Sequence, residues 1–350
     1  MNHRRRVVLL TDYKGEYFPR RKRSSITTDL NRLTRRFAEA GLELDIRRFA
    51  ELRLRDESFA EVPVLYQSSQ DPGLHYKSYL EDLLLALELQ GARLIPAFHL
   101  FRAHHNKVLM ELLRDLSPLE EMKTLNARTF GTFEDFDAVA DDLRYPAVLK
   151  IADGDSSRGV ALAQSPKEAR RIARKLSFSF AAKDVFDNVT RRITDPAIRP
   201  ASLYRRKFLV QDFVPGLQHD YKTLVFGDRL FTARRSARKD DFRASGSGRT
   251  LKFPDPPPAG MLDLAEKIAE SAPSPFASID ILDDGERLHV SEVQFVRFGV
   301  VIVAMAPFCW SRTEGGWTKV AGPFSLEDEI ARSVLRFLER SIASRRLGRR

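Results

Sequence analysis

The sequence predicts an α/β protein that begins with a parallel sheet and continues as an α+β region rich in antiparallel hairpins. In roughly the first hundred residues, short apolar strands alternate with helical patterns, and this alternation is typical of a parallel sheet. Later segments place two apolar strands around a tight turn, which indicates hairpins. With 350 residues, of which 43% are hydrophobic, the chain can bury a substantial core. We expect two or three domains.

The first domain is predicted to span residues 1–103. Apolar runs bounded by turn residues indicate its strands, and helical stripes indicate its helices. The leucine-rich stripe within 76–90 is more typical of a helix packed on a core than of a cofactor contact. We expect strands at 7–11, 42–48, 62–66 and 93–95, and helices at about 26–40 and 76–90, each helix ending before a glycine.

A second domain is predicted at 104–210. The apolar run 145–151, Tyr-Pro-Ala-Val-Leu-Lys-Ile, indicates a strand, and 166–176 has the pattern of a polar, basic helix. The charged stretch 183–207 contains two prolines that interrupt regular structure. We therefore expect no regular element in that stretch.

The third domain is predicted at 211–350. A strand from Phe208 enters it, and a hairpin follows whose turn lies at Gly227 and Asp228. A second hairpin covers 278–294. The last helix, at about 325–343, has an apolar stripe that predicts docking on the core.

The second hairpin is the most informative segment, because it carries three oxygen ligands. Glu292 and Gln294 are two residues apart on one strand, so both side chains leave the same face. If residues 283–287 form the loop, Val290 lies opposite Asp280 and Glu292 is a diagonal neighbour, roughly 7 to 8 Å away between backbones. Two carboxylates and an amide oxygen suit one or two Mg²⁺ ions shared with substrate phosphates, with Mn²⁺ as an alternative. Taken alone, the hairpin also fits an ordinary solvent-facing strand.

A loop of phosphate-binding composition follows the strand that carries Lys150. Its sequence is Asp153-Gly-Asp-Ser-Ser-Arg-Gly159. Small residues let backbone N–H groups approach phosphate oxygens, and the lysine adds a positive charge for the same anion. Similar turns close many hairpins that bind nothing, so the loop alone is weak support. Its order relative to the acidic hairpin is the stronger signal.

These motifs, in this order, make residues 104 to about 300 resemble the ATP-grasp superfamily. Within it, the carboxylate–amine ligases of the D-alanine:D-alanine ligase and ribosomal-protein glutamate ligase type are the most similar. The resemblance implies an N-terminal α/β domain and two further domains that enclose a nucleotide. It also implies that Lys107 and Lys150 contact the nucleotide phosphates. The mobile flap over them would be 153–159, with Gly154, Ser156, Ser157 and Gly159.

The same resemblance assigns roles farther along the chain. Asp220 and Lys222 match an Asp-x-Arg segment of the relatives, with lysine in place of arginine, and Arg243 matches an arginine near the transferred phosphoryl group. Asp220 would then bind the nucleotide, Lys222 and Arg243 would be catalytic, and Asp280 and Glu292 would be the metal carboxylates. The linker whose backbone hydrogen-bonds adenine would be Gln211, Asp212, Phe213 and Val214.

Gln294 departs from the family pattern. The relatives usually have Glu-x-Asn, whereas this chain has Glu292-Val-Gln294. Glutamine keeps the amide oxygen and adds one methylene, so it reaches a metal if the strand lies about 1 Å farther away. The substitution leaves open whether one or two ions bind, and it is compatible with a pseudoenzyme.

The resemblance implies an ADP-forming ligase that uses ATP and Mg²⁺ to join a carboxylate to an amine, or to a thiol, through an acyl phosphate. The carboxylate would belong to a small molecule, a peptide or a sugar acid. The resemblance is also compatible with a homodimer. A phosphotransferase with a hydroxyl acceptor is the alternative enzyme. A nucleotide-binding module without turnover is the alternative that is not an enzyme.

The composition of the chain bears on its partners, its cysteine chemistry and its cellular location. The net charge of +10 invites a nucleic-acid partner, but the basic clusters are not interleaved with aromatics as in RNA- or DNA-binding modules, so such a partner is disfavoured. The lone cysteine, Cys309, excludes an intrachain disulfide and a cysteine-rich metal site. No apolar run is long enough for a membrane span and no signal-peptide core is present, so we expect a cytoplasmic protein.

Overall fold

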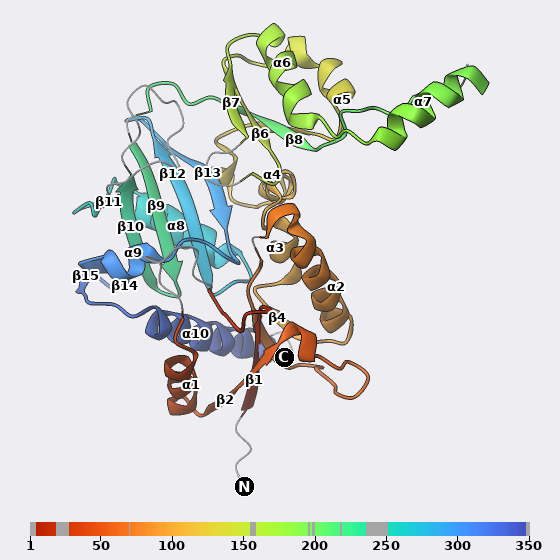
Figure 1. Ribbon diagram of the computed structural model, residues 1–350. Coiled ribbons are helices and arrows are strands. Elements are labelled where there is room, and N and C mark those ends of the chain that lie inside the picture. The colour runs from red at the N-terminus through yellow and green to blue at the C-terminus, as the bar shows by residue number, and fades with distance from the viewer. Residues whose placement is uncertain are drawn as a thin grey trace.

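The computed structural model describes residues 5–18, 28–69, 71–154, 159–194, 197, 200–217, 219–235 and 251–347. Within these residues, the strands form one parallel sheet and two antiparallel sheets (Figure 1). The predicted α/β class, with a parallel sheet first and an α+β region after it, is confirmed.

The first sheet is parallel, as predicted, and has the strand order β2-β1-β3-β4. The apolar run in β1 is buried on both faces, as expected of a central parallel strand. Asp29 caps the first helix by accepting a hydrogen bond from the Arg32 amide at 3.1 Å. The elements are β1 (Arg5–Thr11), α1 (Leu30–Glu39), β2 (Leu42–Arg48), β3 (Pro63–Tyr66), α2 (His75–Leu89), β4 (Arg93–Ile95) and α3 (Phe98–Ala103), with 3₁₀ turns at Phe49–Glu51 and Pro72–Leu74.

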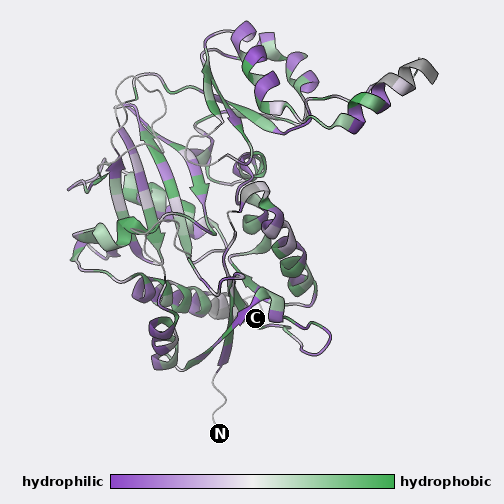
Figure 2. Ribbon diagram, in the orientation of Figure 1, coloured by the Kyte–Doolittle hydropathy of each residue, from purple (hydrophilic) through white to green (hydrophobic). Residues whose placement is uncertain are grey.

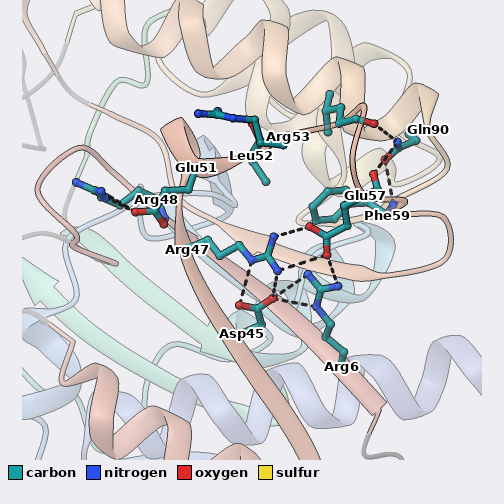
Figure 3. Close-up of polar contacts among 11 residues, drawn as sticks. Arg6, Asp45, Arg47, Arg48, Glu51, Leu52, Arg53, Glu57, Phe59 and Gln90 are labelled. Atoms are coloured by element: carbon teal, nitrogen blue, oxygen red, sulfur yellow. Dashed lines mark hydrogen bonds and ion pairs between the residues drawn. The ribbon is translucent and has the colours of Figure 1, made fainter.

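Four charged side chains at the edge of this sheet form a closed ring of ion pairs, which we call the edge quartet. Each of its two arginines contacts both of its carboxylates at 2.5 to 2.8 Å (Figure 3). Its members are Arg6 on β1, Asp45 and Arg47 on β2, and Glu57 in the loop that follows.

The lid sheet, as we call the smaller antiparallel sheet, has the order β5-β8-β6-β7. It has a hydrophobic core of its own, formed with α5 and α6. The elements are α4 (Lys107–Asp115), β5 (Ala127–Phe130), α5 (Phe133–Asp137), β6 (Ala147–Ile151), β7 (Val160–Ala163), α6 (Pro166–Ser177), α7 (Ala182–Thr194) and β8 (Phe208–Asp212), with 3₁₀ turns at Glu120–Lys123 and Ala140–Asp142.

Helix α7 corrects the expectation that 183–207 contains no regular element. The helix ends at Thr194, two residues before Pro196, so the prolines limit its length but do not prevent it. Figure 1 shows α7 extending away from the lid sheet.

The large sheet has the order β13-β12-β9-β10-β14-β15, with β11 paired to β10. The predicted hairpin turn at Gly227 and Asp228 is confirmed, because Phe226 pairs with Arg229. The elements are β9 (His219–Phe226), β10 (Arg229–Arg235), β11 (Leu251–Lys252), α8 (Met261–Ser271), β12 (Phe276–Asp283), β13 (Leu288–Gln294), α9 (Val301–Met305), β14 (Phe308–Thr313), β15 (Gly316–Ala321) and α10 (Leu326–Leu347).

The parallel sheet and the large sheet share their hydrophobic cores. One cluster contains Val7 of β1, Phe37 of α1, Phe226 of β9 and Val334 of α10. A second joins β1 and α2 to α8, β12 and β13. Figure 2 shows hydrophobic residues running along the strands of these sheets. No helix among the described residues is both long and apolar enough to cross a bilayer.

Candidate active site

The acidic hairpin forms, but its register differs from the predicted one. Asp283 pairs with Leu288, so the loop is shorter than 283–287. A β-bulge then shifts the register, and Asp280 lies directly opposite Glu292, not Val290. Without the bulge, Asp280 would face Ser291 and the Glu292 side chain would leave the other face of the sheet. The bulge therefore places both carboxylates on one face, closer together than the diagonal spacing we expected.

Asp280 belongs to a second group of four charged side chains, the site quartet. Lys222 Nζ lies 2.9 Å from Asp280 Oδ1, and Arg235 Nη2 lies 3.0 Å from Asp280 Oδ2. Arg235 Nη2 also lies 2.6 Å from Asp220 Oδ1. These residues come from neighbouring strands, because Asp280 pairs with Lys222 and Asp220 pairs with Arg235. The quartet is thus a chain of three ion pairs across β12, β9 and β10.

Burial and ion pairing give the two carboxylates of the site quartet different pKa values. Burial raises the pKa of Asp280, but Lys222 and Arg235 together outweigh it and lower the pKa to about 2. Burial also raises the pKa of Asp220, and its contact with Arg235 offsets only part of that effect, so the pKa rises to about 6. Asp280 is therefore ionised at neutral pH.

Lys107, Glu292 and Gln294 gather beside the quartet. Lys107 Nζ lies 3.9 Å from Glu292 Oε1 and donates a hydrogen bond to the Gly154 carbonyl oxygen. Gln294 Nε2 donates to Glu292 Oε1 at 3.0 Å, so the amide and the carboxylate share a face, as predicted from their spacing. Asn106 caps α4 by accepting from the Leu109 amide at 3.3 Å, which holds Lys107 at the first position of that helix.

Lys150 starts a line of buried polar contacts. Its Nζ donates to Gln211 Oε1 at 2.6 Å, and Gln211 Nε2 lies 3.5 Å from Glu111 Oε1. Glu111 in turn lies 3.2 Å from Arg114 Nη2. Burial lowers the pKa of Lys150 and raises the pKa of Glu111. The line joins the lid sheet to α4.

Arg114 carries this line to the bulge of the acidic hairpin. Its Nη1 donates to the Val290 carbonyl oxygen at 2.9 Å and its Nη2 to the Ser291 carbonyl oxygen at 3.4 Å. The side chain is 2% exposed, so these contacts are shielded from water. Arg114 therefore supports the backbone segment that turns Glu292 toward Asp280, and Figure 1 shows α4 between the lid sheet and β13.

The remaining predicted site residues lie at the ends of lid-sheet strands or outside the described residues. Asp212 ends β8; its amide donates to the Asn126 carbonyl oxygen at 2.9 Å, and its side chain accepts from Asn126 at 2.7 Å. Phe213 and Val214 follow the strand end. Gly154 and Gly159 are described residues of the predicted flap, and Gly159 has a φ of +69°, where an added Cβ would clash with the Ile151 side chain. Arg243, Ser156 and Ser157 lie outside the described residues.

His104 and His105 lie between α3 and α4. His104 is buried, and burial lowers its pKa well below the usual value.

Sequence reasoning missed Arg235, Glu111 and Arg114. Arg235 had a detectable signal, because the predicted turn at 227–228 places it opposite Asp220. Arg114 and Glu111 form an ion pair three residues apart, but such pairs are common on helices. Their contacts with Val290, Ser291 and Gln211 lie far along the chain and have no local signal.

The donor set fits a hard divalent cation. Asp280 and Glu292 offer carboxylate oxygens and Gln294 offers an amide oxygen, which are the ligand types that Mg²⁺ takes when it is shared with phosphates. Among the described residues, no group of three or more His, Cys, Asp or Glu side chains is arranged to hold a metal by itself. The set is therefore suited to an ion that completes its shell with substrate oxygens and water.

Comparison with family models and with curated proteins found no match. Solved structures do match. The chain superposes on D-cycloserine synthetase with a TM-score of 0.54 and 13% identity, covering 96% of this chain and 99% of that one. It superposes on D-alanine–D-alanine ligase from Bacillus anthracis with a TM-score of 0.50 and 13% identity, covering 98% and 99%.

A third match is N5-carboxyaminoimidazole ribonucleotide synthetase in complex with ADP, with a TM-score of 0.52 and 12% identity, covering 87% of this chain and 73% of that one. All three matched proteins are ATP-grasp proteins. The chain has the ATP-grasp fold. In this fold, the acidic hairpin lies on the large sheet, and the Lys150 strand lies on the lid sheet.

Proposed function

We propose that the protein is an ATP- and Mg²⁺-dependent ligase that joins a carboxylate to an amine, or to a thiol, and releases ADP. The observation that carries the proposal is the acidic hairpin. Asp280 and Glu292 lie opposite each other, Gln294 shares their face, and Lys222 and Lys107 lie 2.9 Å and 3.9 Å from the two carboxylates. Opposite charges alternating on one face suit a phosphate chain and its counter-ion.

The matched structures support this reaction class. Their names describe a ligase and two synthetases, and one of them was solved with ADP. In the proposal, residues 1–103 form the N-terminal α/β domain, 104–210 the lid domain with the phosphate flap, and 211–350 the catalytic, metal-binding domain.

Asp280, Glu292 and Gln294 would hold Mg²⁺, which when bound supplies positive charge to the nucleotide's terminal phosphates. Lys107 and Lys150 would bind the same phosphates. Lys222 and Arg243 would stabilise charge that develops on the transferred group. The adenine would lie against 211–214. Asp280 suits the metal role because its pKa of about 2 keeps it ionised at neutral pH.

The chemistry needs no nucleophile from the protein. A substrate carboxylate oxygen attacks the γ-phosphorus, the bond to the β-phosphate oxygen breaks, and ADP leaves. The amine then attacks the acyl carbon, phosphate leaves with the carboxylate oxygen, and the amine gives up a proton. The residues of the site act by positioning and by electrostatic stabilisation.

The test is isotopic. The protein is first incubated with ATP, Mg²⁺ and a panel of amino acids, small peptides and sugar acids, to find an acid that stimulates ATP consumption. The reaction is then repeated with that acid labelled with ¹⁸O in its carboxylate. A ligase transfers one labelled oxygen to the released phosphate. A phosphorylated acceptor without free phosphate would instead identify a phosphotransferase. ATP binding without consumption of ATP by any acid on the panel would identify a nucleotide-binding module.

A further inference from the structure

A second charged pocket lies where α2 and α3 meet the ends of β6 and β8. Its volume is about 280 Å³. The walls come from two parts of the fold, because Lys77, Glu81 and Arg102 belong to the N-terminal side, whereas Asp153 and Lys207 belong to the lid side. Of these residues, only Asp153, which begins the predicted flap 153–159, has a predicted nucleotide role.

The charges that line the pocket do not balance. Its lining includes four cations and two carboxylates among the described residues, which leaves two positive charges in excess at neutral pH. The cations are Lys77, Arg102, Arg206 and Lys207, and the carboxylates are Glu81 and Asp153. A structural network of ion pairs, such as the edge quartet, needs no such excess.

The two carboxylates are already engaged. Glu81 accepts from the buried Lys77 and from Arg102, the latter at 2.9 Å. Asp153 accepts from Arg206 Nη2, with its two oxygens at 3.0 and 3.1 Å. Lys207, which is exposed at the pocket, contacts no carboxylate within the part of the chain that the structure describes. It is the cation most available to a ligand.

Burial and neighbouring cations act against the charged form of both pocket lysines, although nearby carboxylates offset part of this effect. Partial burial lowers the pKa of Lys207, and the positive charges of Arg102 and Lys77 lower it further. Burial lowers the pKa of Lys77 despite its contact with Glu81. A bound anion would relieve this repulsion.

We propose that this pocket binds a small dianion, either a phosphate group or a pair of carboxylates. The two excess charges match a charge of −2. The pocket is separate from the cations proposed for the nucleotide, yet it adjoins them, because Asn106 precedes Lys107 and Asp153 precedes Gly154, whose carbonyl oxygen accepts from Lys107. Given the proposed function, on which this step rests, the dianion belongs to the carboxylate substrate or is the phosphate that the reaction releases.

The experiment measures anion binding to the full chain by calorimetry, at constant ionic strength and with a saturating non-hydrolysable ATP analogue and Mg²⁺. The probes are inorganic phosphate and succinate. Lys207→Gln should weaken binding about tenfold, as expected for one lost charge-assisted contact. Asp153→Asn should tighten it several-fold, because it frees Arg206 and adds one positive charge to the excess. Binding of phosphate alone would assign a phosphate group; binding of both probes would extend the class to dicarboxylates.

Lys175→Gln is the matched control, because Lys175 is an exposed lysine on α6 outside the pocket. The proposal fails if neither probe binds more tightly than about 10 mM, or if Lys207→Gln and Asp153→Asn behave like this control. Repeating the titration without the nucleotide analogue separates the two proposals. If the protein binds the anion but neither binds nor consumes ATP, the pocket proposal is supported and the proposed ligase function is wrong. If the protein is an active ligase but binds neither anion, the ligase function is supported and the pocket proposal is wrong.

Discussion

The edge quartet and the site quartet each contain two cations and two carboxylates, but they differ in burial and in closure. The side chains of the edge quartet are 22% to 30% exposed, and its contacts close a ring. Those of the site quartet are 1% to 16% exposed, and its contacts form an open chain. In the edge quartet, burial opposes the ionised form of Glu57, but Arg47 and Arg6 outweigh it and lower the pKa.

In the site quartet, the carboxylate with two cationic partners has a lowered pKa and the one with a single partner has a raised pKa. In a buried site, the number of cationic partners therefore decides whether the pKa of a carboxylate is raised or lowered. Where water screens the charges, ion pairs contribute roughly 0 to 1 kcal/mol each, and removal of one partner is tolerated. In a buried series of ion pairs such as the site quartet, removal of one partner leaves an uncompensated charge.

The largest expected difference between the quartets concerns activity. Asp280 and Asp45 are both carboxylates held by two cations. Asp280→Asn should reduce Mg²⁺-dependent ATP turnover by at least about 100-fold, because it removes a metal ligand. Asp45→Asn, the matched control, should keep turnover within about twofold of wild type. Steady-state ADP formation at saturating Mg²⁺ measures both.

Glu292→Gln should behave like Asp280→Asn, and circular dichroism should show that all three variants are folded. The metal assignment is wrong if Asp280→Asn or Glu292→Gln retains near-normal turnover. A loss of turnover in Asp45→Asn equal to that in Asp280→Asn would mean that both quartets act only through stability.

A smaller effect should follow from loosening the support of the site. Arg114→Lys keeps a positive charge beside Glu111, but an ammonium group cannot bridge two carbonyl oxygens as a planar guanidinium does. We expect turnover to fall about tenfold and the Mg²⁺ concentration for half-maximal rate to rise, because Glu292 is held less firmly. Kinetics over a Mg²⁺ series, with hydrogen exchange at 290–291, measure the two effects.

A purely structural role for Arg114 would give a different pattern. Turnover per folded molecule and the Mg²⁺ requirement would then stay at wild-type values while the thermal stability fell. Arg47→Lys in the edge quartet is the matched control, since it loosens a similar set of ion pairs far from the hairpin.

The smallest expected effect is on stability as a function of pH. Because the pKa of Asp220 is raised to about 6 in the folded protein, its folded form holds a proton more tightly than the unfolded chain does. Its contribution to the unfolding free energy is therefore present below about pH 4 and lost as the pH rises to about 6. Asp220→Asn should reduce this loss by on the order of 1 kcal/mol, as measured by urea unfolding at pH 4 to 7.

Glu57 should show the opposite sign. Its lowered pKa stabilises the fold above the ordinary carboxyl range and loses that contribution as the pH falls. Glu57→Gln should therefore change the slope only on the acid side. Identical slopes for both variants would show that the two quartets do not differ in the way that their burial indicates.

The sequence predicted those parts of the fold that depend on local patterns. Alternating strands and helices indicated the parallel sheet, and glycine and aspartate at 227–228 indicated the β9–β10 hairpin, which is confirmed. Local prolines misled the prediction for 183–207, because they lie beyond the C-terminal end of α7.

The candidate site was predictable to the level of residue types on one strand. Period-two spacing placed Glu292 and Gln294 on one face, and their hydrogen bond agrees with this. The bulge that faces Glu292 toward Asp280 was not predictable, because a single unpaired residue leaves no pattern in the sequence. Nor was its support, since Arg114 contacts carbonyl groups 176 and 177 residues away. The roles of these residues in catalysis stay predictions.

The core shared by helices α1 and α10 has a consequence for how the chain folds during synthesis. Leu33 and Phe37 of α1 pack in one cluster with Ile330, Val334 and Leu338 of α10. During translation the first group leaves the ribosome nearly three hundred residues before the second. The part of the apolar face of α1 that packs on α10 must therefore stay uncovered until α10 has been synthesised. This exposes the nascent chain to aggregation and makes the docking of α10 a late folding step.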